Sequence, residues 1–60
     1  MKSQITKLAN ELLRSSQDQT AMAASFDRSG EHAYAAYALN EAKRMAADGR
    51  ALLTMAAQYR

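Results

Sequence analysis

Asp27-Arg28-Ser29-Gly30 is the only turn signal in a chain of 60 residues, and Pro is absent. Glycine can take the left-handed conformation that ends a helix, and Ser or Asp can cap the helix that follows. Glu31 comes next, where a carboxylate suits the positive end of a helix dipole. The sequence therefore predicts a helix at about residues 3–27, a turn at 28–30 and a second helix at about residues 31–59.

The composition also favours helices. Fourteen Ala, six Leu and four Met stand against one Ile and no Val. Ala, Leu and Met are strong helix formers, whereas strands draw on β-branched and aromatic residues. We therefore expect an all-α fold with one domain over residues 1–60, an antiparallel two-helix hairpin that pairs into a four-helix bundle dimer.

Small side chains recur every seven residues in both predicted helices, which is the spacing of a heptad seam. Folding the chain about Ser29 brings the two small rows into register. The layers formed in this way pair Ala23 with Ala35, Ser16 with Ala42, and Ala9 with Gly49. Small residues at every layer would let the helix axes approach to the short end of the usual range of about 8–10 Å.

Gly49 leaves one alternative open, because a glycine inside a helix costs roughly 0.8–1.0 kcal/mol relative to Ala. A break at Asp48-Gly49 would start a third, short helix at Arg50. We favour one continuous helix, since Gly49 is in phase with the small row and the apolar stripe keeps its phase beyond it.

Two polar residues, Ser16 and Gln19, interrupt the inward stripe of the first helix. The other members of that stripe are Ile5, Leu8, Ala9, Leu12, Ala23 and Phe26. Ser is small and Gln is long enough to reach water, which is the interpretation that we favour. The alternative is a polar layer that fixes the register of a bundle.

Larger apolar residues lie beside the small rows, and two helices cannot enclose all of them. One flank carries the predicted protein interface: Tyr34, Tyr37, Met45, Leu52, Met55 and Tyr59. Leu8, Met22 and Phe26 are expected on the other flank. Exposed apolar patches of this kind mark interaction surfaces. We therefore expect a homodimer or a larger protein partner; the alternative is that the flank completes the core of a monomer.

The sequence argues against catalysis and cofactors. The chain has no Cys and one His, so a metal site is not expected. The acidic residues are dispersed, and the two glycines cannot form a phosphate loop. We expect no enzyme activity and no small-molecule substrate. Without an apolar run of about 18 residues, we also expect no membrane span, and a cytoplasmic location.

Nucleic acid is the alternative partner. The net charge is +2, and Lys43, Arg44 and Arg50 form a weak basic strip on the second helix. A dimer would double that strip and could present it to phosphates. Glu41 and Asp48 interleave with it, so we favour a protein partner.

Residues 19–42 resemble one tetratricopeptide repeat. The matching positions are Met22, Ala23, Phe26, Gly30, Ala35, Leu39 and Ala42, while Gln19 stands where the repeat has Trp. The resemblance implies a hairpin surface that grips another helix. Taken together, the sequence predicts a small helical interaction module with an adaptor, chaperone-like or inhibitor role. Its size would suit a bacterial, plasmid or phage accessory protein.

Overall fold

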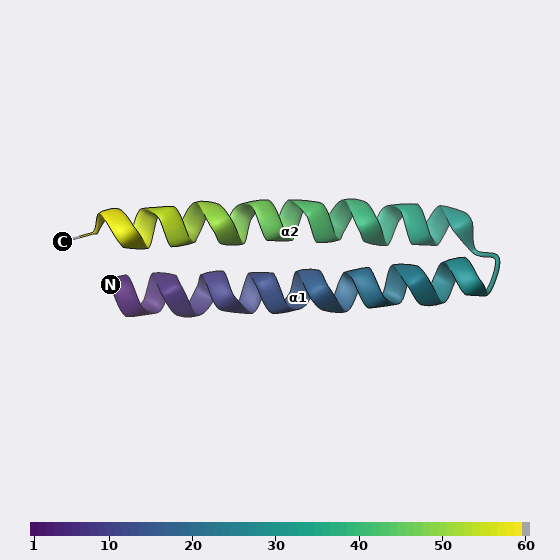
Figure 1. The fold of residues 1–60 in the computed structure, drawn as a ribbon, viewed down its shortest axis with the longest axis horizontal. Helices are drawn as coiled ribbons and strands as arrows, with labels where there is room; N and C mark the ends of the chain where they lie inside the picture. The colour runs from purple at the N-terminus through teal and green to yellow at the C-terminus, as the bar shows by residue number, and fades with distance from the viewer. Residues whose placement is uncertain (60) are drawn as a thin grey trace.

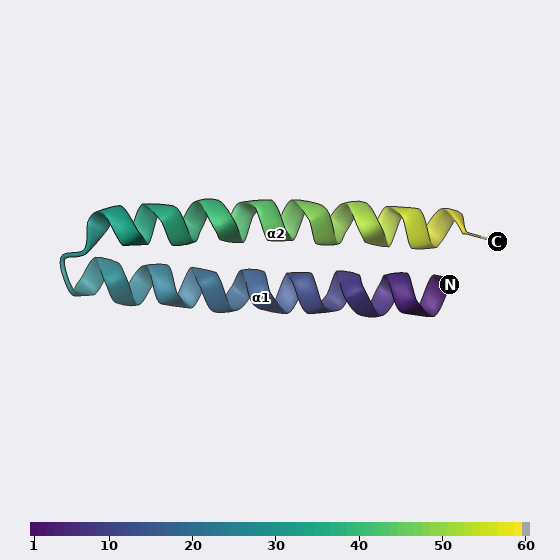
Figure 2. The same cartoon turned by 180° about the vertical axis from the view of Figure 1, so that it is seen from behind.

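Two long helices lie side by side and antiparallel in the computed structural model, which describes residues 1–59 (Figure 1). Helix α1 spans Lys2–Arg28 and helix α2 spans His32–Gln58. The view from behind shows both chain termini at the end opposite the bend (Figure 2). The predicted all-α hairpin is therefore confirmed. Compared with the predicted bounds, α1 is one residue longer at each end and α2 one residue shorter.

The bend closes through backbone hydrogen bonds. Gly30 has a φ of +79°, the left-handed conformation that the turn signal predicts. The Glu31 N–H donates to the Phe26 carbonyl at 2.8 Å, and the Gly30 N–H donates to the Asp27 carbonyl at 3.1 Å. This pair of bonds is the Schellman motif, which satisfies two carbonyls at the end of α1.

The predicted side-chain cap of the second helix is wrong. Glu31 is the N-cap residue of α2, and no side chain caps that helix. Asp27 is turned elsewhere, because its Oδ1 lies 2.5 Å from Nδ1 of His32. The Schellman motif already fixes the chain at this point, so α2 begins without help from Ser or Asp.

The two helices meet along a seam of small residues. The Ser16 hydroxyl donates to the Ala42 carbonyl across the helices at 2.8 Å. A Cβ at Gly49 would lie 3.1 Å from the Ala9 carbonyl oxygen. Helix α2 continues through Gly49, so no third helix begins at Arg50. We call this row the seam; its buried residues are Ala9, Ser16, Ala23, Ala35, Ala42, Gly49 and Ala56.

Only small residues are buried in this hairpin. Apart from the seam, the one other buried residue is Ala38, and no large side chain among residues 1–59 is fully buried. A domain of about 60 residues has little stability to spare even with a normal core. In the described part of the chain, neither helix has a stretch that is long and apolar enough to cross a bilayer.

Candidate functional site

A flat hairpin has two broad faces, and the seam decides which residues point to each. On both helices, the residue just before a seam residue and the residue three positions after it point to one face. The residues one and four positions after a seam residue point to the other face. Two contacts at the bend agree with this division. Phe26 packs against Tyr34 with ring centroids 5.7 Å apart, while the next residue, Asp27, meets His32.

The first broad face is rich in large apolar side chains. We call it the apolar face; its apolar members are Ile5, Leu8, Leu12, Met22, Phe26, Tyr34, Met45, Leu52 and Met55. Several of them are strongly exposed: Tyr34 is 62% exposed, Met55 54% and Leu8 49%. Met45 and Leu52 are half-buried against the rest of the hairpin. This face is thus continuous over both helices.

The predicted assignment of two separate flanks is wrong. The contact between Phe26 and Tyr34 brings the residues expected on opposite flanks onto one face. Leu8, expected to point inward, is exposed because it precedes the seam residue Ala9 by one position. In an antiparallel pair, residues at the same sequence offset from the seam point to the same face on both helices. The residues expected on two flanks therefore lie on one face.

Two of the six predicted interface residues lie outside the apolar face. Tyr37 is 68% exposed and comes two positions after Ala35, which points it away from α1. Tyr59 follows the end of α2 in extended backbone and lines a hollow at the open end with Met1 and Thr6. The other four, listed above, are all on the apolar face.

Polar residues interrupt the apolar face at Asp48, which is exposed one position before the seam residue Gly49, and at a patch of three residues closer to the bend. Ser15, Gln19 and Glu41 are half-buried there. The Arg44 guanidinium donates to the Glu41 carboxylate at 2.6 Å, so Arg44 is held beside this patch. It therefore lies apart from Lys43 and Arg50. The sequence interpretation considered a polar layer at Ser16 and Gln19; in the structure Ser16 belongs to the seam, and Ser15 shares the face of Gln19.

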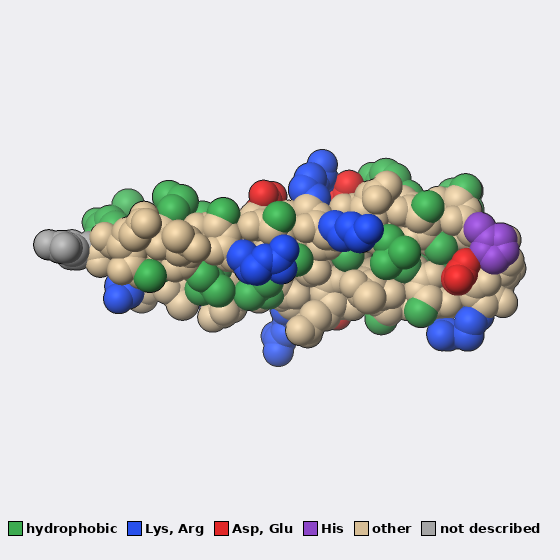
Figure 3. Space-filling view, turned by 45° about the horizontal axis from the view of Figure 1, so that its top comes forward, with side chains coloured by type: hydrophobic (Ala, Val, Ile, Leu, Met, Phe, Trp, Pro, Cys, Tyr) green, Lys and Arg blue, Asp and Glu red, His purple; other side chains and the backbone are tan. Residues whose placement is uncertain are grey.

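The second broad face is mixed, with Lys43 and Arg50 among apolar residues that include Leu13, Leu39 and Leu53. We call it the basic face; a shallow hollow of about 320 Å³ lies on it, lined by Ser16, Thr20, Leu39, Ala42, Lys43, Ala46 and Arg50. No acidic residue lines this hollow, and neither Lys43 nor Arg50 forms an ion pair with residues 1–59. Figure 3 shows basic side chains near the middle of this side and the imidazole next to an acidic group at the bend.

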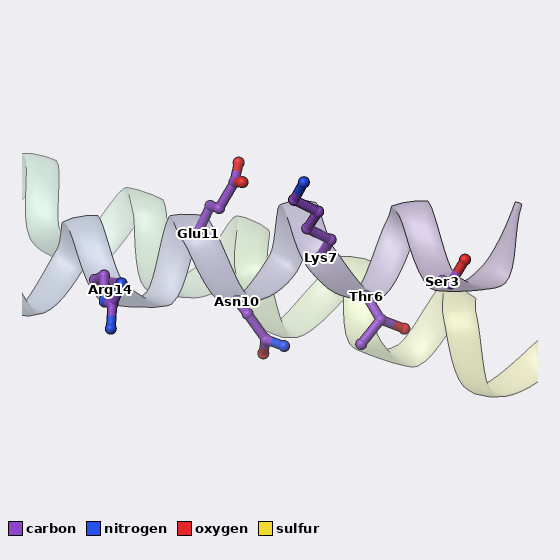
Figure 4. A pocket seen from close by; sticks show the side chains of 6 residues that line it. All are labelled: Ser3, Thr6, Lys7, Asn10, Glu11 and Arg14. Carbon is purple, nitrogen blue, oxygen red and sulfur yellow. The ribbon is translucent and has the colours of Figure 1, made fainter.

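A third hollow lies on the surface of α1. It is lined by Ser3, Thr6, Lys7, Asn10, Glu11 and Arg14. All six come from one helix, and Figure 4 shows Lys7 and Glu11 pointing to one side while Asn10 and Arg14 point to the other. Because the side chains diverge, they cannot surround a ligand.

Comparison with known proteins returns no match: no family model, curated protein or solved structure matches this chain. The resemblance of residues 19–42 to a tetratricopeptide repeat therefore has no family-level support. The candidate functional surfaces are defined by geometry alone, as one apolar face and one basic face.

Proposed function

We propose that this chain is a non-enzymatic helical interaction module that works through its apolar face. It either self-associates or folds together with helices of a partner protein. One observation carries the proposal: the buried residues are all small, and every large apolar side chain of residues 1–59 keeps some exposure to water.

Energetics support this function. Burial of apolar surface stabilises a fold by about 25 cal/mol per Å², and the Ala and Gly of the seam offer little such surface. Four exposed large hydrophobic residues lie on the apolar face, and two of them, Tyr34 and Met55, are more than half exposed. A second layer of helices over this face would remove that area from water and supply the missing stability. Tyr and Met are also common at the centres of protein interfaces.

The role that follows is one of binding, in keeping with an adaptor, chaperone-like or inhibitor protein. Such a module would become stable together with its partner, because the seam and the Schellman motif set the geometry of the hairpin but bury only small residues.

Light-scattering mass combined with circular dichroism tests the proposal on three proteins. We expect the unaltered chain to exceed its monomer mass of 6.6 kDa. Leu52→Asp, on the apolar face, should reduce the mass to that of a monomer, whereas Leu39→Asp, on the basic face, should not. A poorly helical unaltered monomer would support folding with a partner instead. Three helical monomers of equal stability would contradict the proposal.

Binding of nucleic acid through the basic face is the second candidate. The observation in its favour is the hollow at Lys43 and Arg50, which no acidic residue lines. Phosphate binding depends steeply on salt, because counterions are released when lysine and arginine contact the backbone. We would expect a gel shift with RNA or DNA at low salt that disappears at moderate salt; no shift even at low salt would exclude this candidate.

A further inference from the structure

We infer that the apolar face binds a basic amphipathic helix of another protein in preference to a second copy of this chain. This inference rests on the proposed function of that face and adds the chemistry of the partner. The charged side chains on the face are two carboxylates, Glu41 and Asp48, each one position before a seam residue. No lysine or arginine occupies an equivalent position on either helix. The face is therefore apolar and acidic.

One of these carboxylates has no cation beside it. The Arg44 guanidinium reaches Glu41 from the outer edge of α2, at 2.6 Å. Asp48 is exposed and forms no ion pair with residues 1–59. Any occupant that covers the face takes Asp48 out of water, and a buried charge without a partner strongly destabilises an interface. The occupant that fits best therefore supplies a positive charge at Asp48.

The hydrogen bond across the seam shows which residues of a second copy would meet Asp48. Ser16 of α1 is level with Ala42 of α2, so Asp48 lies level with residue 10 and Glu41 level with residue 17. The middle of the hairpin is near residue 15, since α1 spans Lys2–Arg28. These levels can be compared for both two-fold arrangements of the face.

A second copy offers Asp48 no cation in either arrangement. With the bends at the same end, α1 of one copy lies across from α2 of the other, and Asp48 lies against Leu8 and Leu12. With the bends at opposite ends, the two α2 helices face each other. Asp48 then lies across from Ala38 of the second copy and within about one turn of its Glu41. Like charges and unpaired charges both weaken an interface, so a second copy covers the face with lower affinity.

A single helix with an apolar stripe and lysine or arginine beside that stripe fits the face better. The broad side of the hairpin is 13 Å wide between Cα atoms, and a helix with its side chains is about 10–12 Å across. One helix laid along the hairpin therefore contacts both α1 and α2. The half-buried apolar residues that it would cover are Ile5, Leu12, Phe26, Met45 and Leu52.

The spacing of the two carboxylates defines the positions of the partner's basic residues. Glu41 and Asp48 are seven residues apart on one helix, which is about 10.5 Å along its axis. Two lysine or arginine residues seven apart on the partner helix have the same separation. Their hydrogen bonds to the carboxylates are charge-assisted and stronger than neutral ones.

Two synthetic helical peptides of about four heptads test this inference. Both carry the same stripe of leucine and alanine, but lysine lies beside the stripe in one peptide and glutamate in the other. We expect the unaltered chain to bind the basic peptide about tenfold or more tightly than the acidic one, measured by fluorescence anisotropy. Light-scattering mass should show one chain with one peptide. Binding of the basic peptide should weaken as salt is added, because salt screens these charges.

A charge reversal locates the binding site. Asp48 has no ion pair to lose, so Asp48→Lys should fold like the unaltered chain. It should weaken binding of the basic peptide and strengthen binding of the acidic one, each by about tenfold. Ala47→Lys is the matched control, since Ala47 is exposed on the same helix outside the apolar face. This control should keep the preference for the basic peptide.

The outcomes separate this inference from the proposed function. Equal binding of the two peptides, or a preference that Asp48→Lys leaves unchanged, would overturn the basic partner. Binding of neither peptide to a chain that self-associates would also overturn it, and the second copy would be the occupant. In these cases the proposed function of the face stands. Leu52→Ala should weaken binding of both peptides, and unchanged binding would contradict the proposed function itself.

Discussion

The seam and the apolar face of this hairpin differ in the size and in the exposure of their side chains. Along the seam, Ala, Gly and Ser are fully enclosed and bring the two backbones close together. On the apolar face, Leu, Met and Tyr are large and remain exposed. The seam thus fixes the geometry of the hairpin while contributing little buried apolar area. The apolar face carries exposed apolar area that would stabilise the hairpin when a partner covers that face.

The most damaging change to the seam should be Gly49→Leu. A Cβ at this position would lie 2.9 Å from Cγ of Leu13 and 3.1 Å from the Ala9 carbonyl oxygen. The backbone oxygen cannot move aside without moving α1. We expect the free energy of unfolding to fall by about 2–3 kcal/mol, measured by urea denaturation.

Ala47→Leu is the matched control for that experiment. Ala47 is exposed on the same helix, two residues before Gly49, so an added side chain meets no neighbour across the seam. It should change stability by less than about 0.5 kcal/mol. Equal stability of Gly49→Leu and Ala47→Leu would mean that the helices do not meet closely at this layer.

A substitution on the apolar face should weaken association without changing the geometry of the seam. Met22→Asp places a charge on a residue that is 46% exposed in the isolated hairpin. Loss of a buried Met contributes about 1.5–3 kcal/mol, and a two-fold dimer loses it twice. We therefore expect the dissociation constant to rise by about a hundredfold or more, measured by analytical ultracentrifugation.

Ala24→Asp provides the comparison, since Ala24 is exposed one position after the seam residue Ala23 and so points to the basic face. It should leave the dissociation constant nearly unchanged. If the two aspartate variants weakened association equally, the division into an apolar and a basic face would be wrong.

A smaller effect is expected at the side-chain hydrogen bond that joins the helices within the seam. Ser16→Ala removes the bond of 2.8 Å to the Ala42 carbonyl without changing the size of the layer. We expect a loss of about 1 kcal/mol in thermal or urea unfolding. Ser25→Ala, on an exposed position of α1, should be neutral. A neutral Ser16→Ala would indicate that small size alone explains serine in the seam.

The smallest effect on assembly should come from the basic face. Lys43→Glu combined with Arg50→Glu reverses both charges of the hollow, and neither residue forms an ion pair in the described chain. We expect an unchanged molecular mass and a stability change within about 0.5 kcal/mol. A dissociated double variant would show that the basic face takes part in the dimer.

The hairpin could be predicted from the sequence because its signals are local and agree with one another. Gly30 marks the bend, and the seven-residue recurrence of small residues aligns Ser16 with Ala42 and Ala9 with Gly49 without further information. The predicted side-chain cap of α2 is wrong, because a Schellman motif and a side-chain cap share the same residue types around Gly30 and differ only in backbone geometry.

The faces were harder to predict than the seam. The pattern of each helix by itself predicts Met22 and Tyr34 on opposite flanks. Their common face depends on the antiparallel arrangement, in which equal offsets from the seam point the same way on both helices. Likewise, Arg44 is adjacent to Lys43 in sequence, but its guanidinium donates to Glu41 in the structure. Successive residues of a helix are rotated by about 100°, so these two basic side chains point in different directions.

The most direct test of the account is the melting temperature of the unaltered chain, followed by circular dichroism over a hundredfold dilution. The central claim is that the seam alone does not hold the hairpin and that a second layer over the apolar face is required. Because association stabilises the folded state by mass action, the melting temperature should fall steadily as the protein is diluted. A helical protein that melts cooperatively at the same temperature at every concentration would contradict the claim.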